Sequence, residues 1–247
     1  MRIGLVSYEC RNNDPAFNLS QIEKALRTAE GKADLLCFGE AFLQGFDCLS
    51  WSDDQDAETA AEQSSDLIGK LADLSVKYGT ALLCGYIEKE ADCLYSSCIV
   101  LSQGKIVHNY RRISKGWKEC AKTDGHYREG TTVESFRLHG MKMTIALCGD
   151  LWEFPERFIT DGLLVWPVYV SYDVEEWENG ILEEYAGQAG HAAGDTLMVN
   201  PIDRPQNHGG SFRFLNGRVN SRIPFDREGI LFVSVDDSQN LITDEVS

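Results

Sequence analysis

Residues 144–152 read Thr-Ile-Ala-Leu-Cys-Gly-Asp-Leu-Trp, so an apolar run ends at a cysteine that is followed by glycine and aspartate. The short apolar run over residues 141–147 predicts a buried strand. Gly149 permits a sharp turn directly after the sulfur of Cys148. A thiol on such a turn is open to a substrate and to nearby backbone N–H groups. Free cysteine is also among the most buried residue types, so this segment alone fits a core cysteine equally well.

Strand-like and helix-like segments alternate along the rest of the chain. Strands are predicted at residues 3–8, 33–38, 81–88, 97–101, 105–112, 163–170, 196–200, 210–214 and 230–235, before a polar tail. Helices are predicted at residues 18–29, 57–78, 154–161 and 176–194. The turn Ser102-Gln103-Gly104 predicts a hairpin. No Pro/Gly/Ser-rich linker interrupts this alternation. It therefore predicts a single layered α/β domain over residues 1–247, with helices outside stacked sheets.

The composition excludes some classes of partner. The 247 residues carry a formal net charge of −16. A surface this acidic argues against nucleic acid and anionic membrane as partners, because both require a basic surface. No apolar stretch approaches the ~20 residues that a bilayer-spanning helix requires. The N-terminus enters a strand pattern directly, without the apolar core of a signal peptide, which predicts a cytoplasmic protein.

Cysteine and histidine spacing predicts no metal site. The chain has 8 cysteines and 5 histidines. The cysteines include no Cys-x-x-Cys pair, and the histidines lack the spacing of metal ligands. In the absence of a secretion signal, we expect the cysteines to be reduced and most of them to lie in the core.

Three predicted strands end at reactive side chains. Glu40 follows the strand at residues 33–38, Arg112 and Lys115 follow the strand at 105–112, and Cys148 follows the third. Strand ends gather at one edge of a layered α/β fold, where sites form. A carboxylate, a cation and a thiol brought together there would make a nucleophilic hydrolase site, with the cation and backbone N–H groups holding the oxyanion.

Five motifs occur in a fixed order along the chain: Phe38-Gly39-Glu40, Gly85-Tyr86-Ile87-Glu88, Tyr110-Arg111-Arg112, Cys148-Gly149-Asp150-Leu151-Trp152 with Phe154-Pro155-Glu156, and Gly209-Gly210-Ser211. In this order they resemble the nitrilase (carbon–nitrogen hydrolase) superfamily, from residue 3 to about residue 235. The resemblance implies a four-layer α-β-β-α sandwich and a Glu-Lys-Cys triad that cleaves nonpeptide C–N bonds through a thioester. It also implies no metal or organic cofactor, and a homodimer or higher homo-oligomer.

The resemblance assigns roles to individual residues. Cys148 matches the nucleophile and Glu40 the general base. Glu119 matches a second glutamate that supports the site in many members, although it also fits one end of a surface ion pair with Lys115 or Lys118.

The lysine of the triad is where this chain departs from the family. The family motif is Tyr-Arg-Lys, and its third position here is Arg112. Either Arg112 supplies the cation directly, or Lys115 reaches the pocket from a shortened loop. We favour Lys115, because arginine and lysine are not interchangeable where one compact charge is required, and we retain Arg112 as the alternative.

The predicted turn at Cys148 and Gly149 is called the elbow below. The residues around it have predicted roles of their own. Gly149 and Trp152 are expected to contact the substrate, although Trp152 fits a packing role equally well. Asp150 is expected to stabilise the turn by accepting hydrogen bonds from nearby backbone N–H groups.

The first hypothesis is therefore a hydrolase of a small amide or N-carbamoyl compound, with nitriles less favoured. One alternative is a catalytically weakened homologue that serves as a binding or scaffold module, and the missing lysine favours it. A second is an acyltransferase that uses the same thioester. A glutaminase role in NAD synthesis is expected to require a separate partner chain.

Overall fold

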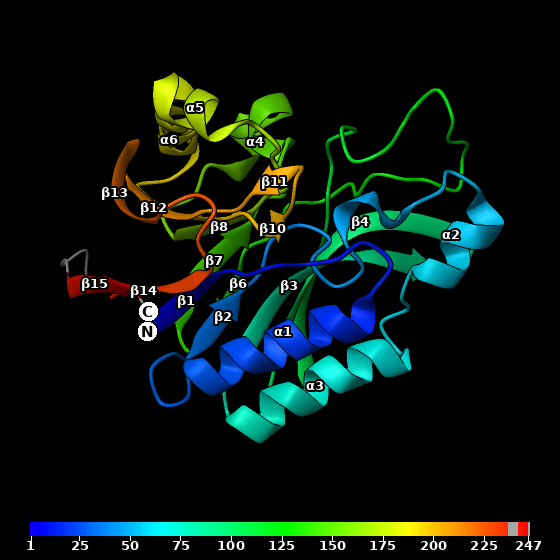
Figure 1. Cartoon of the computed structure of the whole chain (residues 1–247), viewed down its shortest axis with the longest axis horizontal. Coiled ribbons are helices and arrows are strands. Elements are labelled where there is room, and N and C mark those ends of the chain that lie inside the picture. The colour runs from blue at the N-terminus through cyan, green and yellow to red at the C-terminus, as the bar shows by residue number, and fades with distance from the viewer. Residues whose placement is uncertain (237–241, 247) are drawn as a thin grey trace.

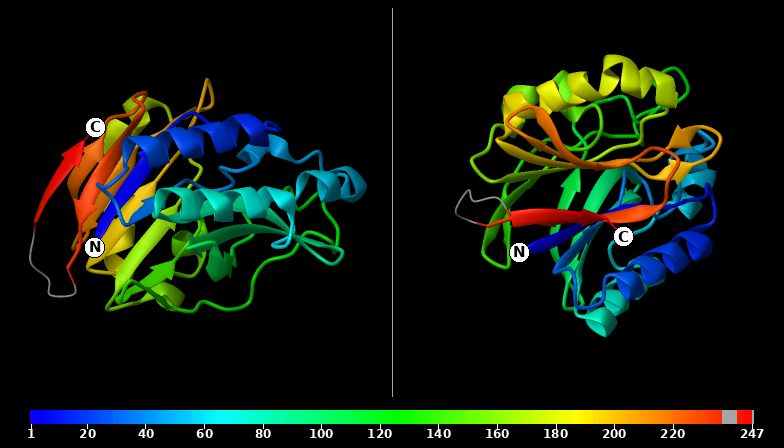
Figure 2. Two further views of the ribbon diagram at one scale, coloured as in Figure 1. Left: turned by 90° about the horizontal axis from the view of Figure 1, so that it is seen from below. Right: turned by 60° about the vertical axis from the view of Figure 1, so that its left-hand side comes forward.

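Two β-sheets lie face to face with helices on their outer surfaces, as a computed structural model of residues 1–236 and 242–246 shows (Figures 1 and 2). The first sheet has the order β15-β14-β1-β2-β3-β4-β5. Its strands are β1 (Arg2–Ser7), β2 (Leu35–Cys37), β3 (Ala81–Glu90), β4 (Cys93–Ser102), β5 (Lys105–Arg111), β14 (Gly229–Ser234) and β15 (Ile242–Val246).

The second sheet has the order β13-β12-β9-β8-β7-β6. Its strands are β6 (Phe136–Leu138), β7 (Met141–Ile145), β8 (Leu163–Pro167), β9 (Asp195–Val199), β12 (Ser211–Leu215) and β13 (Arg218–Ile223), and β10 (Ile202–Asp203) pairs separately with β11 (Asn207–His208). The α-helices are α1 (Pro15–Thr28), α2 (Asp53–Thr59), α3 (Asp66–Tyr78), α4 (Asp150–Glu153), α5 (Val174–Glu176) and α6 (Leu182–Ala192). Because α1 and α3 cover the first sheet and α6 covers the second, the predicted α-β-β-α sandwich is confirmed (Figure 2).

Alternate residues of the central strands face two different cores. In β1, Ile3 and Leu5 face the second sheet, whereas Val6 packs beneath the outer helices. In β2, Cys37 faces the second sheet and Leu36 faces the helices. Successive side chains of a strand point to opposite faces. A sheet that is covered on both faces therefore needs an unbroken apolar run, which explains the strand sequences.

Local signals fix the two helices that cover the first sheet. The Asp14 side chain accepts a hydrogen bond from the N–H of Phe17 at 3.0 Å, and Pro15 occupies the first turn of α1. Both features favour a helix start. Helix α3 ends at Gly79, whose φ of 63° is open to glycine at little cost.

The parallel strands bring the site together at one edge of the sandwich. Strands β1, β2 and β3 run parallel in the first sheet, and β7, β8 and β9 run parallel in the second. The N–H of Glu40, just after β2, donates to the carbonyl of Val168, just after β8, at 3.2 Å. The carboxyl ends of the two parallel groups therefore meet.

The predicted helix at residues 57–78 is wrong as one helix, because residues 60–65 separate α2 from α3. Ala61 pairs with the first sheet instead: its N–H donates to the carbonyl of Ile87 at 2.9 Å, and its carbonyl accepts from Lys89 at 3.0 Å. Ser65 then caps α3 by accepting from the N–H of Ile68. Pairing with a strand here overrides the helical spacing.

Further elements also differ from the sequence predictions. The predicted helix at 154–161 is instead a short 3₁₀ turn at Pro155–Phe158, and α4 ends before it at Glu153. The helix at 176–194 is interrupted by a π-helical segment at Trp177–Ile181, where Gly180 has a φ of 123°. The polar tail contains β15, although residues 237–241 and 247 lie outside the described residues. Strands β6 and β13 were not predicted either, because β6 has only 3 residues and β13 is mostly polar. None of the helices in the described residues is long and apolar enough to cross a membrane.

The close approach of the Glu40 loop to β3 depends on Gly85. A Cβ at Gly85 would lie 2.4 Å from the carbonyl oxygen of Gly39 and 2.7 Å from the Cα of Glu40. Because both neighbours are backbone atoms, we expect Gly85→Ala to lower the free energy of unfolding by about 1–3 kcal/mol, measured by chemical denaturation. The matched control is Gly69→Ala, whose Cβ meets nothing within 4 Å in α3 and should not destabilise. Equal stability of the two variants would contradict this packing.

Candidate active site

Cys148 lies on a strained turn directly after β7. Its φ is 36°, a value that non-glycine residues adopt rarely and at a cost. Three hydrogen bonds hold the turn. The Cys148 N–H donates to the carbonyl of Pro167 at 3.0 Å, its carbonyl accepts from Trp166 Nε1 at 2.9 Å, and its thiol lies 3.5 Å from the carbonyl oxygen of Tyr169. As a residue Cys148 is only partly buried, whereas burial of its thiol is the main cause that raises the thiol pKa.

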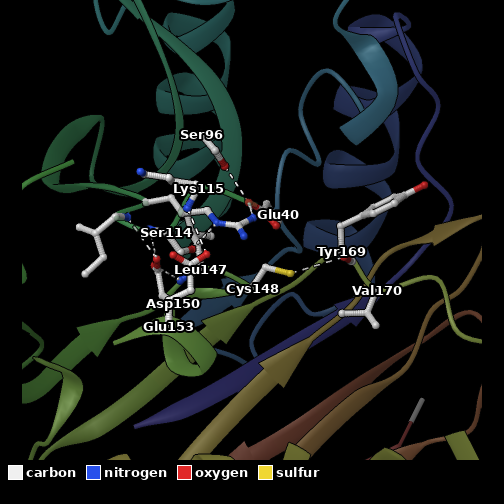
Figure 3. A network of polar contacts seen from close by, with 12 residues as sticks. Glu40, Ser96, Ser114, Lys115, Leu147, Cys148, Asp150, Glu153, Tyr169 and Val170 are labelled. Carbon is white, nitrogen blue, oxygen red and sulfur yellow. Dashed lines mark hydrogen bonds and ion pairs between the residues drawn. The ribbon is translucent and has the colours of Figure 1, made fainter. Parts of the chain in front are cut away.

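Glu40 is fully buried at the end of the first sheet. Its Oε1 accepts hydrogen bonds from Ser96 Oγ at 2.8 Å and from Arg112 Nη1 at 2.9 Å (Figure 3). Its Oε2 is buried and accepts no hydrogen bond from the part of the chain that the structure describes. A buried carboxylate oxygen without a partner is costly, and such groups mark functional sites. Glu40 therefore has one oxygen fixed and one available as a proton acceptor.

Arg112 supplies the cation that meets Glu40. It follows β5 and is 2% exposed. Its Nε donates to Ser114 Oγ at 2.7 Å, and its backbone N–H donates to the carbonyl of Ser96 at 2.9 Å. Burial disfavours the charged guanidinium, but the Glu40 and Asp150 carboxylates and Cys148 together outweigh this effect and raise the pKa of Arg112. Arg112 is therefore permanently charged.

The structure does not bring Lys115 into this cluster, so the preferred placement of Lys115 in the pocket is wrong. Lys115 is exposed, and its backbone N–H donates to Glu153 Oε1 at 3.2 Å (Figure 3). Its side chain makes no hydrogen bond or ion pair with other described residues. The cause is the chain direction after Ser114, which turns Lys115 toward solvent.

Glu119 makes no hydrogen bond or ion pair with Glu40, Arg112 or Cys148 within the described residues. It is exposed in the loop after β5, and only its carbonyl, which accepts from Lys122 and Thr123, takes part in hydrogen bonds within residues 1–236. No ion pair with Lys115 or Lys118 forms there either; Lys118 pairs with Glu129 at 2.7 Å.

Asp150 has a larger role than the predicted stabilisation of its own turn. Its Oδ2 accepts from the N–H of Leu147 at 2.8 Å and from Tyr110 Oη at 2.6 Å. Its Oδ1 accepts from the N–H groups of Ile113 and Ser114 at 3.1 and 2.8 Å. This one buried carboxylate thus joins the Cys148 elbow in the second sheet to the segment that follows Arg112.

The charges around Cys148 act on its thiol in opposite directions. Burial and the Glu40 carboxylate raise the pKa of Cys148 to about 12, whereas Arg112 lowers it. The thiol is therefore protonated at neutral pH, and its attack on a substrate requires a proton acceptor. The partnerless Oε2 of Glu40 can serve as that acceptor.

The two residues expected to contact a substrate both follow Cys148, Gly149 at the start of α4 and Trp152 within it. Trp152 is 43% exposed and packs edge-on against Tyr185, with 5.1 Å between the ring centroids. Gly149 lies against the guanidinium, since a Cβ there would be 2.5 Å from Arg112 Nη2.

Three site residues were missed from the sequence. Ser96 and Ser114 hold the charged pair, and the carbonyl of Tyr169 faces the thiol. The available signal was Ser96-Ser97, a polar pair inside the apolar strand β4. The described residues include no group of three or more His, Cys, Asp or Glu side chains placed to hold a metal ion.

The model of the carbon–nitrogen hydrolase family matches residues 2–160. The chain is 26% identical over 153 residues to a glutamine-dependent NAD(+) synthetase of Thermotoga maritima, and 27% identical over 156 residues to an (R)-stereoselective amidase of a Pseudomonas species. These matches cover 62% and 63% of this chain but only 26% and 54% of the two relatives.

A solved CN-hydrolase superfamily protein of Xanthomonas campestris has the same fold. It superposes with a TM-score of 0.75 at 17% sequence identity, and the match covers 96% of this chain and 91% of that one.

The four hydrogen bonds to Asp150 give a stability prediction. Asp150→Asn replaces an acceptor oxygen by an amide donor that faces N–H or O–H groups. Because buried unpaired donors are costly, we expect the free energy of unfolding to fall by about 2–4 kcal/mol in chemical denaturation. Tyr110→Phe removes one of the four donors and should cost about 1–2 kcal/mol. A smaller loss for Asp150→Asn than for Tyr110→Phe would contradict the central role of this carboxylate.

The effect of Glu40 on the thiol gives a second prediction. Glu40→Gln removes a negative charge that raises the pKa of Cys148, so this pKa should fall. Iodoacetamide should then alkylate Cys148 faster at each pH between 7 and 9, as measured by peptide mass spectrometry. Cys120 is exposed in the same chain and serves as the internal control whose rate should not change. Slower alkylation of Cys148 in the variant would reverse the predicted sign.

Proposed function

Because this chain belongs to the carbon–nitrogen hydrolase family, we propose that it hydrolyses a small amide or N-carbamoyl compound at Cys148. The observation that carries the proposal is the buried ion pair between Glu40 and Arg112 at 2.9 Å, whose charges both act on the Cys148 thiol. A base, a permanent cation and a thiol on a strained elbow are the parts that covalent acyl transfer requires.

In the first half of the proposed reaction, Glu40 takes the thiol proton while Sγ attacks the carbonyl carbon of the substrate. A C–S bond forms and the carbonyl oxygen becomes an oxyanion. Glu40 then returns the proton to the departing nitrogen as the C–N bond breaks. Ammonia or an amine leaves, and the acyl group stays on Cys148 as a thioester.

In the second half, Glu40 accepts a proton from a water molecule that attacks the thioester carbonyl. The C–S bond breaks, the acid or carbamate product leaves, and the proton returns to Sγ. General-base assistance of this kind typically contributes ~10²–10⁴-fold to the rate.

Arg112 is proposed to stabilise the oxyanion by charge alone. A guanidinium does not release its proton in a protein, so Arg112 cannot act as the acid toward the leaving nitrogen. Every proton transfer therefore passes through Glu40. The proposed triad is Glu40, Arg112 and Cys148, and Gly149 and Trp152 remain candidates for substrate contact.

A glutaminase role is the second candidate. The similarity to a glutamine-dependent NAD(+) synthetase favours glutamine as the amide. An acyltransferase would use the same thioester and differ only in an amine acceptor. A scaffold role without turnover is the outcome if no amide is cleaved.

The oligomeric state belongs to the proposal as well. We propose a homodimer or higher homo-oligomer, and the side chain of Ile159, which is 69% exposed, is an apolar group available for the contact. Sedimentation of the purified protein tests this part independently of activity.

The test of the proposed function is ammonia release from a panel of aliphatic amides, ω-amides, N-carbamoyl compounds and glutamine. On the substrate that is cleaved, Arg112→Ala should lower kcat by roughly 10²–10³-fold, the usual loss when an oxyanion donor is removed. Lys115→Ala is the matched control, because Lys115 is exposed, and its kcat should stay within about twofold. A loss for Lys115→Ala as large as that for Arg112→Ala would contradict the assignment of the cation.

A further inference from the structure

The outer nitrogen of Arg112 lies between two glycines. A Cβ added to Gly149 would lie 2.5 Å from Nη2, and a Cβ added to Gly116 would lie 3.0 Å from the same atom. At Gly116, Nη2 is the only atom found within 4 Å among the described residues. The two missing side chains therefore leave room for one terminal nitrogen of the guanidinium.

Backbone geometry does not explain why position 149 is glycine. Gly149 has a φ of −64° and a ψ of −10°, which any residue adopts in a helix start. The added Cβ would otherwise meet Ser114 Oγ at 3.2 Å, which is also part of the arginine environment. The restriction at position 149 comes from Arg112 and its partner.

The guanidinium cannot move aside easily. Its Nε is held by Ser114 Oγ at 2.7 Å, and its Nη1 is held by Glu40 Oε1 at 2.9 Å. Arg112 is 2% exposed and Ser114 is fully buried. Rotation away from Gly149 would break both bonds inside the protein, where unpaired charged groups are costly.

We propose that Gly149, Gly116 and Ser114 form a guanidinium slot, three positioning residues that fit this site to arginine and aim its Nη2 edge beside Cys148. The site is thus adapted to arginine, and Arg112 is more than a tolerated replacement for lysine. A lysine at position 112 would leave Ser114 Oγ without its donor and leave the space at Gly149 empty, because an ammonium lacks the planar fork of a guanidinium. The catalytic consequence rests on the proposed function, whereas the slot itself does not.

The test is a double-mutant cycle of Arg112→Lys and Gly149→Ala, with thermal unfolding as the first readout. In the native background, Gly149→Ala should lower Tm by about 2–10 °C, because the methyl group overpacks the held guanidinium. In the Arg112→Lys background, the same change should raise Tm by about 1–3 °C, as glycine-to-alanine changes do at a permissive backbone. Gly69→Ala is the control and should raise Tm in both backgrounds.

The second readout is alkylation of Cys148 relative to Cys120, which separates positioning from mere stability. Gly149→Ala should slow the alkylation of Cys148 at pH 8, because a displaced guanidinium favours the thiolate less. In the Arg112→Lys background, the added methyl group should leave the ratio of the two rates within about twofold.

Two results would overturn the slot. One is a rise in Tm for Gly149→Ala in both backgrounds, and the other is an equal fall in both, including failure of both proteins to fold. Neither readout needs turnover. Absence of amide hydrolysis together with the predicted reversal of Tm would therefore refute the proposed function and leave the slot standing.

Discussion

The ion pair between Glu40 and Arg112 lies almost wholly out of solvent, with exposed fractions of 0% and 2%. Two charges taken out of water are costly, and their attraction repays that cost only when further hydrogen bonds satisfy them. Ser96 and Ser114 supply those bonds, one to each partner. Loss of either charge would leave the other buried and uncompensated, at a cost of about 3–5 kcal/mol.

The pair also ties the geometry of the site to the fold. Glu40 follows β2 and Arg112 follows β5, both in the first sheet, whereas Cys148 follows β7 in the second. Asp150 closes this arrangement by joining the elbow to the segment after Arg112. Burial and the Glu40 carboxylate keep the thiol protonated at rest against the opposite effect of Arg112. In the proposed mechanism, the same carboxylate that raises the thiol pKa therefore also removes its proton.

Sequence alone was sufficient for the parts that depend on local pattern. Apolar runs located the central strands, and strand ends with the motif order located Glu40 and Cys148. The preference for Lys115 over Arg112 as the cation in the pocket was wrong, because the position of Lys115 depends on the direction of the chain after β5. Hydrogen bonds from Ile113 and Ser114 to Asp150, 36 or more residues away, set that direction. The prediction of one helix at residues 57–78 was wrong for a similar reason. Pairing of Ala61 with the first sheet interrupts the helix at residues 60–65, although the helical spacing continues there.

In the proposed mechanism, Cys148 carries the acyl group of an amide during turnover. The direct measurement is peptide mass spectrometry of protein quenched in acid while it hydrolyses an amide. We expect an added mass equal to the acyl group on the peptide that contains Cys148, and no such mass in the Cys148→Ala variant. Steady release of ammonia without any acyl group on Cys148, or with the acyl group on another residue, would contradict it.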